Sequence, residues 1–459
     1  MRAFFLGNPK DFPHHTEVKK VPIPDCKGDE ILIKVAACAV CGTDVKKYFK
    51  GHKLIKSYPV IPGHEFSGKI VKVGKKVKEF EVVTPYGREK RKYEEGQRVV
   101  VAPVVACEKC SNCLDGRFEA CEKREDIGFN YNGGFAEYVV IPGEILKKKI
   151  PPIYFIPDNV SLYEAAIAEP LACAIHAQSK IFRYFGWNKK EKRYNFETGI
   201  KPGDTVVVIG GGPLGCMHAE LAKAQGADVV IIAQRSHRKL EIAKKMEVAD
   251  YYVQNFTSGI LRDEVREITK GRMADVVITA CSVAEAQKQA FEVVKKGGFV
   301  SLFGGVSEKF VEIPTNEIHY NGPLVGGTSG ASPYHLEIAL NLMSQGKINP
   351  TKYITHVLNL ESLDKILFIK GIPQPDFPGF SSMEEAATTI RKEKGSYYLD
   401  VLNKRWCNIN MNISERIRFF KDSIVKALVV PSLSPAEEII FLDELSETEK
   451  KEKLAKIIG

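Results

Sequence analysis

Residues 205–225, TVVVIGGGPLGCMHAELAKAQ, decide the fold of this 459-residue chain. An apolar run of strand length, TVVVIG, leads into GGGPLG (210–215) and then into residues with apolar side chains at helical spacing. The pattern G-x-G-x-x-G supplies a tight turn, close access of a pyrophosphate to backbone, and close helix–strand packing, while the helix N-terminus attracts phosphate. The stretch therefore predicts a dinucleotide site. Its expected contacts are Gly210, Gly212, Pro213, Leu214 and Gly215.

Strands and helices alternate through the residues that follow. DVVIIA (228–233), ADVVITA (274–280) and FVSLFGG (299–305) are apolar runs of strand length, separated by helical stretches. Such alternation predicts an α/β fold, a doubly wound parallel sheet of the Rossmann type with crossover helices. Residues 31–140 differ, because their short β-like runs are broken by glycine and proline, which predicts a β-rich domain.

The end of the second strand bears on the choice of nucleotide. A site for NAD usually has Asp or Glu there to bind the ribose hydroxyls, but this chain has Gln234 followed by Arg235 and, three residues on, Arg238. An acidic residue would repel a 2′-phosphate, whereas arginine pairs with one. We expect Gln234, Arg235 and Arg238 to contact the nucleotide and NADP to be favoured over NAD. The alternative is that these cations are ordinary surface charges on a helix whose N-cap is Ser236.

Four cysteines follow the spacing C-x2-C-x2-C-x7-C within ACEKCSNCLDGRFEAC (106–121). Four neighbouring thiolates complete a tetrahedral shell with no open position, which predicts a structural zinc. The segment is polar and offers no core that would bury unrelated cysteines; an iron–sulfur cluster is the minor alternative. The expected ligands are Cys107, Cys110, Cys113 and Cys121.

A second metal site is predicted from residues that are separate in sequence. Cys41 in VCGTD and His64 in PGHEFSG each lie on a loop beside a strand, and Glu169 in AEPLACAIHA lies where the β-rich pattern gives way to alternation. Sulfur, nitrogen and oxygen ligands of this kind suit a catalytic zinc with an open position. Singly, each residue has a structural explanation: a small buried thiol, a core histidine and a favourable acid at a helix start.

The composition of the chain indicates which classes of binding partner to expect. The 66 Lys and Arg against 57 Asp and Glu leave a net charge of +9, but most of the charge occurs in mixed-sign runs typical of solvated faces, so we expect no nucleic acid partner. No apolar stretch approaches the ~20 residues of a membrane helix, and the N-terminus lacks a signal-peptide core. We expect a cytoplasmic protein with no membrane partner, whose 11 cysteines serve metal or redox chemistry.

Three segments are additions to this plan. TPYGREKRKYEE (84–95) is expected to form a long, charged hairpin loop, and residues 181–199 mix aromatic with basic side chains. From about residue 370 a Pro-rich stretch precedes a predicted strand, KALVVP (426–431). A helix before that strand is indicated by Ile413, Ile417, Phe420 and Ile424. Capping-box patterns at 434–437 and 446–449 predict two further helices.

The chain resembles the medium-chain, zinc-containing alcohol and polyol dehydrogenases over roughly residues 20–360. GHEFSG (63–68), CGTD, GGFAEYV and EPLACAIHA carry the resemblance, and Glu169 in EPL, in place of a cysteine, points to the sorbitol and threonine dehydrogenase side. The resemblance implies a GroES-like catalytic domain at 1–163 with the structural zinc loop, a Rossmann domain at 164–318, and a return to the catalytic domain with a C-terminal extension at 319–459. It also implies a dimer or tetramer.

The same resemblance assigns roles at the catalytic metal. Cys41 and His64 hold the zinc, with Glu65 and Glu169 as direct or water-mediated partners, and Thr43 binds the substrate oxygen and begins a proton relay. Zinc lowers the pKa of a bound alcohol, and the alkoxide then expels a hydride to the nicotinamide. These relatives commonly have histidine where this chain has Lys46. The resemblance therefore does not specify the route by which the proton reaches solvent.

Three functions follow as hypotheses. The first is a zinc-dependent oxidoreductase that acts with NAD(P) on a polyol, sugar alcohol or sugar phosphate; the additions, with IHYNGPLVGGTSGAS (318–332), are similar to those of L-sorbose-1-phosphate reductase and its relatives. The second is an amino-alcohol dehydrogenase of the threonine type. The third is a zinc-stabilised nucleotide sensor or nucleic-acid-binding module without enzymatic activity.

Overall fold

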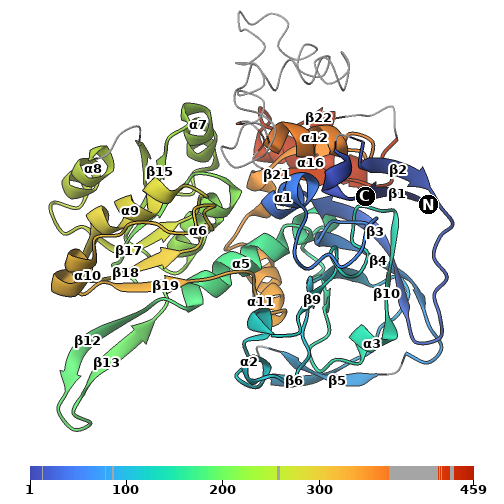
Figure 1. Cartoon of the computed structure of the whole chain (residues 1–459), viewed down its shortest axis with the longest axis horizontal. Coiled ribbons are helices and arrows are strands. Elements are labelled where there is room, and N and C mark those ends of the chain that lie inside the picture. Colours follow the sequence, from blue (N-terminus) through green and yellow to red (C-terminus); the bar gives the residue numbers. More distant parts are fainter. Residues whose placement is uncertain are drawn as a thin grey trace, which may run out of the picture. The chain divides into compact units, whose positions relative to one another are not determined.

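The computed structural model describes residues 1–371 apart from 13, 78, 85–86 and 256–258, together with 422, 424, 426–434 and 439–458 (Figure 1). The chain divides into two compact units. The first comprises Met1–Glu169, Ser332–Ser344 and Pro350–Gly459, and the second Pro170–Ala331 and Gln345–Asn349. These units reflect packing alone, so the domain limits expected at residues 163 and 318 stay a prediction.

The second unit is built on a six-stranded sheet in which every neighbouring pair is parallel. Its strand order is β16-β15-β14-β17-β18-β19. The bounds are β14 Thr205–Ile209, β15 Val229–Gln234, β16 Tyr251–Gln254, β17 Ala274–Thr279, β18 Val294–Leu302 and β19 Leu324–Gly327. Numbered along the chain this is the order 3-2-1-4-5-6 of dinucleotide-binding sheets. The predicted doubly wound parallel sheet is confirmed.

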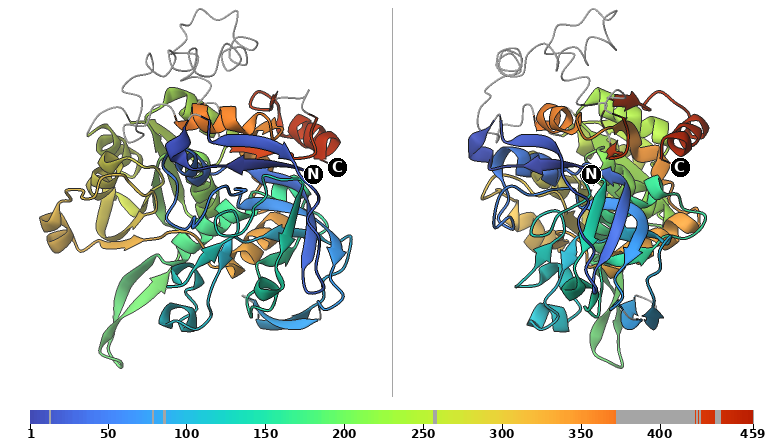
Figure 2. Two further views of the ribbon diagram at one scale, coloured as in Figure 1. Left: turned by 45° about the vertical axis from the view of Figure 1, so that its right-hand side comes forward. Right: turned by 90° about the vertical axis from the view of Figure 1, so that its right-hand side faces the viewer.

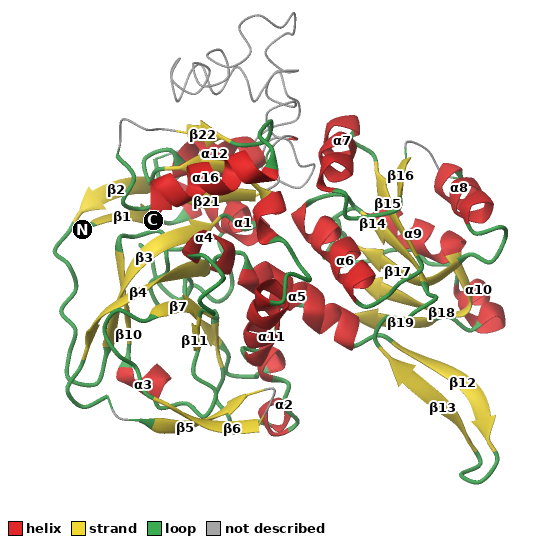
Figure 3. Cartoon of the chain, turned by 180° about the vertical axis from the view of Figure 1, so that it is seen from behind, coloured by secondary structure: helices red, strands yellow, loops and turns green. Residues whose placement is uncertain are grey.

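Helices connect these strands and cover the sheet (Figure 3). They are α6 Pro213–Ala224, α7 His237–Met246, α8 Ile260–Ile268, α9 Ala284–Val293 and α10 Thr315–Asn321, whereas α5 Ala168–Ser179 precedes the first strand of the sheet. The sequence explains their starts: α6 has Pro213 in its first turn, and the Ser236 side chain caps α7 by accepting from Lys239 N. The central strand β14 is fully buried, as its unbroken apolar run requires.

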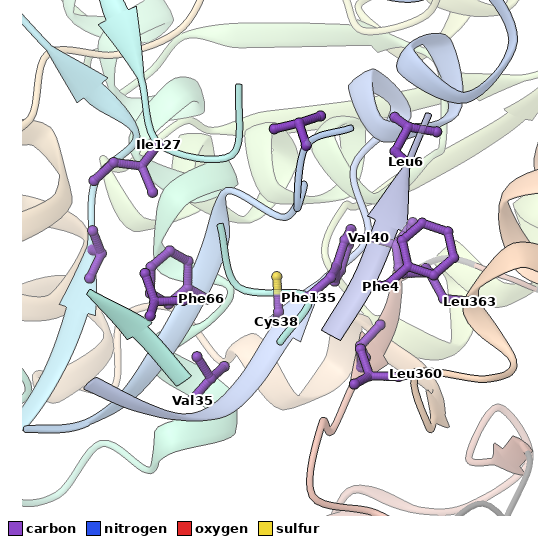
Figure 4. Close-up of a cluster of buried hydrophobic side chains, with 14 of the residues drawn as sticks. Phe4, Leu6, Val35, Cys38, Val40, Phe66, Ile127, Phe135, Leu360 and Leu363 are labelled. Atoms are coloured by element: carbon purple, nitrogen blue, oxygen red, sulfur yellow. The ribbon is translucent and has the colours of Figure 1, made fainter. Parts of the chain in front are cut away.

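The first unit is organised around a larger, mainly antiparallel sheet. Its order is β11-β7-β4-β3-β21-β20-β22, with β10 also paired to β3. The bounds are β3 Ile31–Ala39, β4 Glu65–Val73, β7 Arg98–Val101, β10 Tyr138–Ile141, β11 Ile153–Phe155, β20 Ile354–Leu358, β21 Lys426–Val429 and β22 Ile439–Phe441. Side chains from distant segments, among them Phe4, Phe66, Phe135 and Leu363, fill its core (Figure 4). The β-rich prediction is confirmed.

Short pairs and helices complete the first unit. The pairs join β1 Arg2–Leu6 with β2 Thr16–Lys20, β5 Phe80–Thr84 with β6 Gly87–Arg91, and β8 Val104–Val105 with β9 Glu125–Asp126. The helices are α1 Gly42–Lys50, α2 Ser111–Leu114, α3 Gly143–Leu146, α4 Leu162–Ala165, α11 Tyr334–Ser344, α12 Leu363–Gly371 and α16 Glu447–Ile458. Within the part of the chain that the structure describes, no helix has the length and apolar character to cross a membrane.

The structure departs from the predictions for the first two added segments. Of the predicted loop 84–95, residues 87–91 form strand β6, which pairs with β5, so a hairpin was predicted but these residues are strand and not loop. Residues 181–199 form a hairpin that the sequence did not reveal, with strands β12 Phe182–Asn188 and β13 Arg193–Thr198.

The C-terminal predictions are confirmed in part. The strand predicted at 426–431 is β21, and the capping box at Ser446 opens α16, with Ser446 Oγ donating to Glu449 at 2.6 Å. The other capping-box prediction is wrong for residues 439–441, which form β22. Of the predicted amphipathic helix, Ile413, Ile417 and Phe420 lie outside the described residues, and Ile424 is buried.

Candidate active site and zinc centres

Strand pairing brings Cys41 and His64 together. Ala39 at the end of β3 lies opposite Glu65 at the start of β4, so the residues just beyond these strand ends are neighbours. Cys41 is the N-cap of α1, and its backbone N–H donates to Asp44 Oδ2 at 3.0 Å. The ligand atoms of Cys41, His64 and Glu65 all lie within 4.8 Å of one another. Three residues from two chain segments thus form one group of metal-binding atoms.

Gly63 is required for this approach. It has φ +95°, and a Cβ there would lie 2.8 Å from both Cys38 Sγ and Phe135 N. A side chain would therefore be strained and would clash with buried backbone. This explains the glycine before His64 in GHEFSG.

Buried charges orient the imidazole of His64. Its Nδ1 lies 3.4 Å from Asp44 Oδ1, which also accepts from Lys47 Nζ at 2.9 Å. Lys47 is fully buried, donates to Gly128 O at 3.1 Å and lies 3.6 Å from the centre of the Phe129 ring. Burial alone would lower the pKa of His64, but the Asp44 carboxylate holds it well above its usual value. An acid on Nδ1 leaves Nε2 to face a metal, the usual arrangement for a zinc-binding histidine.

Glu65 is paired with a lysine that sequence reasoning missed. Lys426 Nζ lies 2.5 Å from Glu65 Oε2, and the two side chains are 5% and 1% exposed. β21 pairs with β3 so that Leu428 lies opposite Ala39, and Val40 N donates to Ala427 O, which places Lys426 beside Cys41. Burial opposes the ammonium, yet Glu65, Cys41 and Glu169 together raise the pKa of Lys426. The only sequence signal was a lysine at the start of the apolar run KALVVP.

Glu169 lies near this group without joining it. It is 9% exposed at the start of α5, and its carboxylate is not among the ligand atoms that lie within 4.8 Å of one another. Ser67 Oγ donates to Leu162 O, which ties α4 to β4 shortly before Glu169. Its charge acts on Lys426, so it belongs to the same electrostatic environment. Its expected role as a ligand stays a prediction.

Thr43 and Lys46 differ in their surroundings on α1. Thr43 lies in the first turn, two residues after Cys41, and is half-buried. Lys46 is exposed, whereas its neighbour Lys47 is buried against Asp44. Thr43 is therefore placed near the group of ligand atoms, and Lys46 faces solvent.

The four cysteines of residues 107–121 form a compact cluster. Their sulfur atoms all lie within 4.8 Å, with 3.5 Å between Cys110 and Cys113 and 4.0 Å between Cys107 and Cys113. Zn–S bonds of about 2.3 Å in a tetrahedron put sulfurs roughly 3.8 Å apart, whereas a disulfide needs about 2.0 Å. The distances fit four ligands of one zinc ion.

The thiols of this cluster fall into two electrostatic groups. Backbone N–H groups of Lys109 and Cys110 lower the pKa of Cys107 to about 6, and backbone N–H groups also lower that of Cys110. Burial raises the pKa of Cys113 to about 12 and also raises that of Cys121. A bound cation would stabilise the thiolate form of all four, which is the form that binds zinc.

The glycine turn of the second unit has the shape that a dinucleotide requires. Gly210 has φ +119°, and a Cβ on Gly215 would lie 1.7 Å from Gly210 O, so both positions exclude side chains. Gly212, the N-cap of α6, has open space where a Cβ would stand. Open backbone at a helix N-terminus suits a pyrophosphate. Pro213 and Leu214 begin the helix, as predicted.

The end of β15 lies against this turn. Gln234 Oε1 accepts from Gly211 N at 2.8 Å. Cys281 lies beside the glycine turn, since a Cβ on Gly210 would lie 3.0 Å from Cys281 Cβ. Burial raises the pKa of the Cys281 thiol, and the positive charges of Lys239 and Arg235 oppose that rise. Arg235 and Lys239 therefore gather at the edge of the sheet that carries the glycine turn. Arg238, which the sequence analysis also predicts as a nucleotide contact, is half-buried on α7, the helix that carries Lys239.

Lys426→Met should destabilise the first unit. It leaves the Glu65 carboxylate buried without its counter-ion, which costs about 3–5 kcal/mol. Lys426→Arg should keep most of the stability. Denaturant unfolding followed by circular dichroism measures both, and Glu65→Gln combined with Lys426→Met should lose less than the sum of the single changes. Unchanged stability in Lys426→Met would contradict the ion pair.

Cys110→Ser should remove one zinc ion per chain and lower the melting temperature. A loss of ~3 kcal/mol corresponds to roughly 6–12 °C in a domain of about 150–250 residues, and this larger unit should show a smaller shift. Metal analysis and calorimetry provide the readouts. The matched control is Cys26→Ser, a thiol outside both groups, which should keep the zinc content of the wild type. Equal zinc content in the two variants would rule out the cysteine cluster as a zinc site.

Comparison with known proteins shows the family to which the chain belongs. Models described as the alcohol dehydrogenase GroES-like domain and as zinc-binding dehydrogenase match residues 27–152 and 213–345. Sorbitol dehydrogenase of Halalkalibacterium halodurans is 31% identical over 352 residues, 76% of this chain and 91% of that one. D-arabitol-phosphate dehydrogenase of Enterococcus avium is 30% identical over 352 residues, 75% of this chain and 89% of that one.

A solved structure agrees in fold. A protein of Sinorhizobium meliloti 1021, assigned as a zinc-binding dehydrogenase and solved with bound NADP, has a TM-score of 0.68 and 26% identity and covers 94% of this chain and 99% of its own. The chain belongs to the family of zinc-containing, medium-chain alcohol and polyol dehydrogenases.

Proposed function

We propose that this chain is a zinc-dependent oxidoreductase that transfers a hydride between NADP and a secondary alcohol of a polyol or sugar phosphate. The observation that carries the proposal is the group formed by Cys41, His64 and Glu65, whose ligand atoms lie within 4.8 Å of one another. The same chain contains a unit with the strand order and glycine turn of dinucleotide-binding proteins.

The donor set fits a catalytic zinc. A thiolate, an imidazole and a carboxylate are the ligand types of such sites, and three protein ligands leave a position for substrate. When bound, zinc supplies a Lewis acid that lowers the pKa of the alcohol. We assign Cys41 and His64 as constant ligands, and Glu65 and Glu169 as carboxylates that bind directly or through water.

Neighbouring residues would then prepare the site. Asp44 holds the His64 imidazole through Nδ1, and Lys426 fixes Glu65 in a buried position. Thr43 Oγ1 would accept a hydrogen bond from the substrate hydroxyl and, on taking that proton, give its own hydroxyl proton to water. Bulk water takes the proton at the end of this path, and Lys46 faces that solvent from the same helix.

The nucleotide preference follows from charge at the end of β15. A neutral Gln234, engaged by Gly211 N, replaces the carboxylate that would repel a 2′-phosphate. Arg235 and Lys239 supply positive charge at the same edge of the sheet. The similar Sinorhizobium protein was solved with NADP.

The substrate class is inferred from relatives and chemistry together. The two curated relatives described above are named for sorbitol and for D-arabitol phosphate. Both compounds have several vicinal hydroxyls, and the second also carries a phosphate. We therefore propose a polyol or sugar phosphate, in preference to a simple alcohol.

Cys41→Ser should abolish turnover without unfolding the protein. Loss of one ligand to a Lewis acid that supplies several kcal/mol predicts a fall in kcat of at least about 100-fold. Initial rates with polyols, sugar phosphates and L-threonine, using protein of known zinc content, test this. Cys26→Ser should keep the wild-type rate. Full activity in Cys41→Ser would refute the mechanism, and exclusive use of L-threonine would refute the substrate class.

Arg235→Ala should weaken NADP use selectively. A hydrogen bond from a charged group to the 2′-phosphate contributes about 1.5–3 kcal/mol. Its loss should lower kcat/KM for NADP roughly 10- to 100-fold and change kcat/KM for NAD little. Arg262→Ala, which removes an exposed arginine of helix α8, is the matched control. Equal losses for NAD and NADP would contradict the assignment of Arg235.

A further inference from the structure

The hairpin of β12 and β13 is an unusual surface of the second unit. Figure 2 shows that its two strands extend away from the parallel sheet of that unit. The strands pair antiparallel, Tyr184 opposite Phe196, and a bulge at Gly186 brings Trp187 opposite Tyr194. The family site described above uses none of these residues.

One face of the hairpin carries only aromatic rings and a threonine. Residues opposite each other in an antiparallel pair lie on the same face, as do alternate residues of one strand. The pairing therefore places one set of side chains on this surface, here called the aromatic face. It comprises Phe182, Tyr184, Trp187, Tyr194 and Phe196. Arg183, Phe185 and Glu197 lie on the opposite face.

The rings of the aromatic face pack against each other and remain open to solvent. Ring centres are 6.1 Å apart for Phe182 and Tyr184, 6.3 Å for Tyr184 and Tyr194, and 5.1 Å for Trp187 and Tyr194. Their exposed fractions run from 38% for Phe182 to 58% for Tyr184. Since an aromatic side chain has about 150–250 Å² of surface, roughly 500 Å² of apolar area is open. A contiguous patch of this size is as large as the largest patch of a typical monomer, which is often functional.

The base of the hairpin is held firmly. Arg183 is 5% exposed and donates from both terminal nitrogens to Asp204, at 2.8 Å each. Asp275 and Glu197 lie 3.5 Å and 3.4 Å from the same guanidinium. Phe182 also packs against Phe299 of β18, with 6.0 Å between ring centres. The aromatic face is thus presented on an anchored support and loses little conformational entropy on binding.

We propose that the aromatic face binds the aromatic face of a second copy of this chain. Two such faces would bury roughly 1,000 Å² together, the lower limit for a specific interface. Tyr, Trp and Phe are the residues that interfaces favour, and the face carries no charge that would repel its copy. A shared surface of this kind forms a two-fold interface.

The position of the cations distinguishes a second copy from lipid or nucleic acid. Lys189, Lys190 and Lys192 are exposed at the turn, and Arg193 there is paired with Glu191 at 2.6 Å. A nucleic acid would need positive charge along the stacked rings, and a charged turn does not enter a bilayer. The aromatic face itself has no cation, which disfavours a nucleic acid. The lysines at the turn disfavour a bilayer.

The same charges specify how two hairpins would cross. A parallel arrangement would bring the lysine-rich turns of both copies together. An antiparallel arrangement separates them by the length of β12, about 23 Å for its seven residues at ~3.3 Å each. That exceeds the ~8 Å Debye length at physiological ionic strength. The hairpins should therefore cross antiparallel, with Tyr194 of one copy near Phe182 of the other.

Sedimentation velocity of the full chain tests the interface. Tyr184→Glu combined with Tyr194→Glu should halve the assembly mass or raise its dissociation constant at least about 10-fold. The matched control is Phe185→Glu, which changes a residue of similar exposure, 51%, on the opposite face and should keep the wild-type mass. Circular dichroism and dehydrogenase turnover report whether each variant is folded.

Photo-crosslinking keeps the test independent of folding effects. Benzoylphenylalanine at position 194 should crosslink to residues around 182 of a second copy, and the same probe at position 185 should not. Equal masses of the folded Tyr184/Tyr194 variant and the wild type would overturn the proposal. A monomeric wild type that instead sediments with anionic vesicles or with single-stranded DNA would overturn it as well.

Discussion

The position of β3 between β4 and β21 is the constraint on which the candidate catalytic centre depends. Pairing with β4 puts His64 and Glu65 beside Cys41, and pairing with β21 brings Lys426 to the same place. A slip of one residue in either pair would turn these side chains to the other face of the sheet. The buried ion pair between Glu65 and Lys426 is satisfied only in this register, so the metal-binding group and the register depend on each other.

Charge is arranged differently in the two units, in keeping with the two reactants. Around Cys41 the carboxylates of Asp44 and Glu65 are each matched by a buried lysine, which leaves the side chains of Cys41 and His64 to bind a cation. At the end of β15 the charge is positive and borders open backbone at Gly212. A metal suits the first environment and a phosphorylated nucleotide the second, the pair of partners that a zinc-dependent hydride transfer needs.

The sequence predicted what depends on local patterns and missed what depends on distant pairing. The glycine turn and the cysteine cluster lie within short segments, where spacing alone fixes geometry. Lys426 could not be recognised, since it reaches the site through β21, more than 350 residues after Cys41. Glu169 is not among the atoms of the 4.8 Å group, and its role as a direct or water-mediated partner of the metal stays a prediction. The hairpin after residue 181 was also hidden, because its aromatic residues do not alternate regularly around the bulge at Gly186.

The central claim is that one zinc ion sits among four cysteines and another at Cys41 and His64, where the reaction takes place. Anomalous X-ray scattering at the zinc edge, on crystals of enzyme that turns over a polyol, tests it most directly. The account predicts two peaks per chain, one inside the cysteine cluster and one about 2.0–2.3 Å from Cys41 Sγ and a His64 nitrogen. Active crystals with no peak at Cys41 and His64 would contradict it.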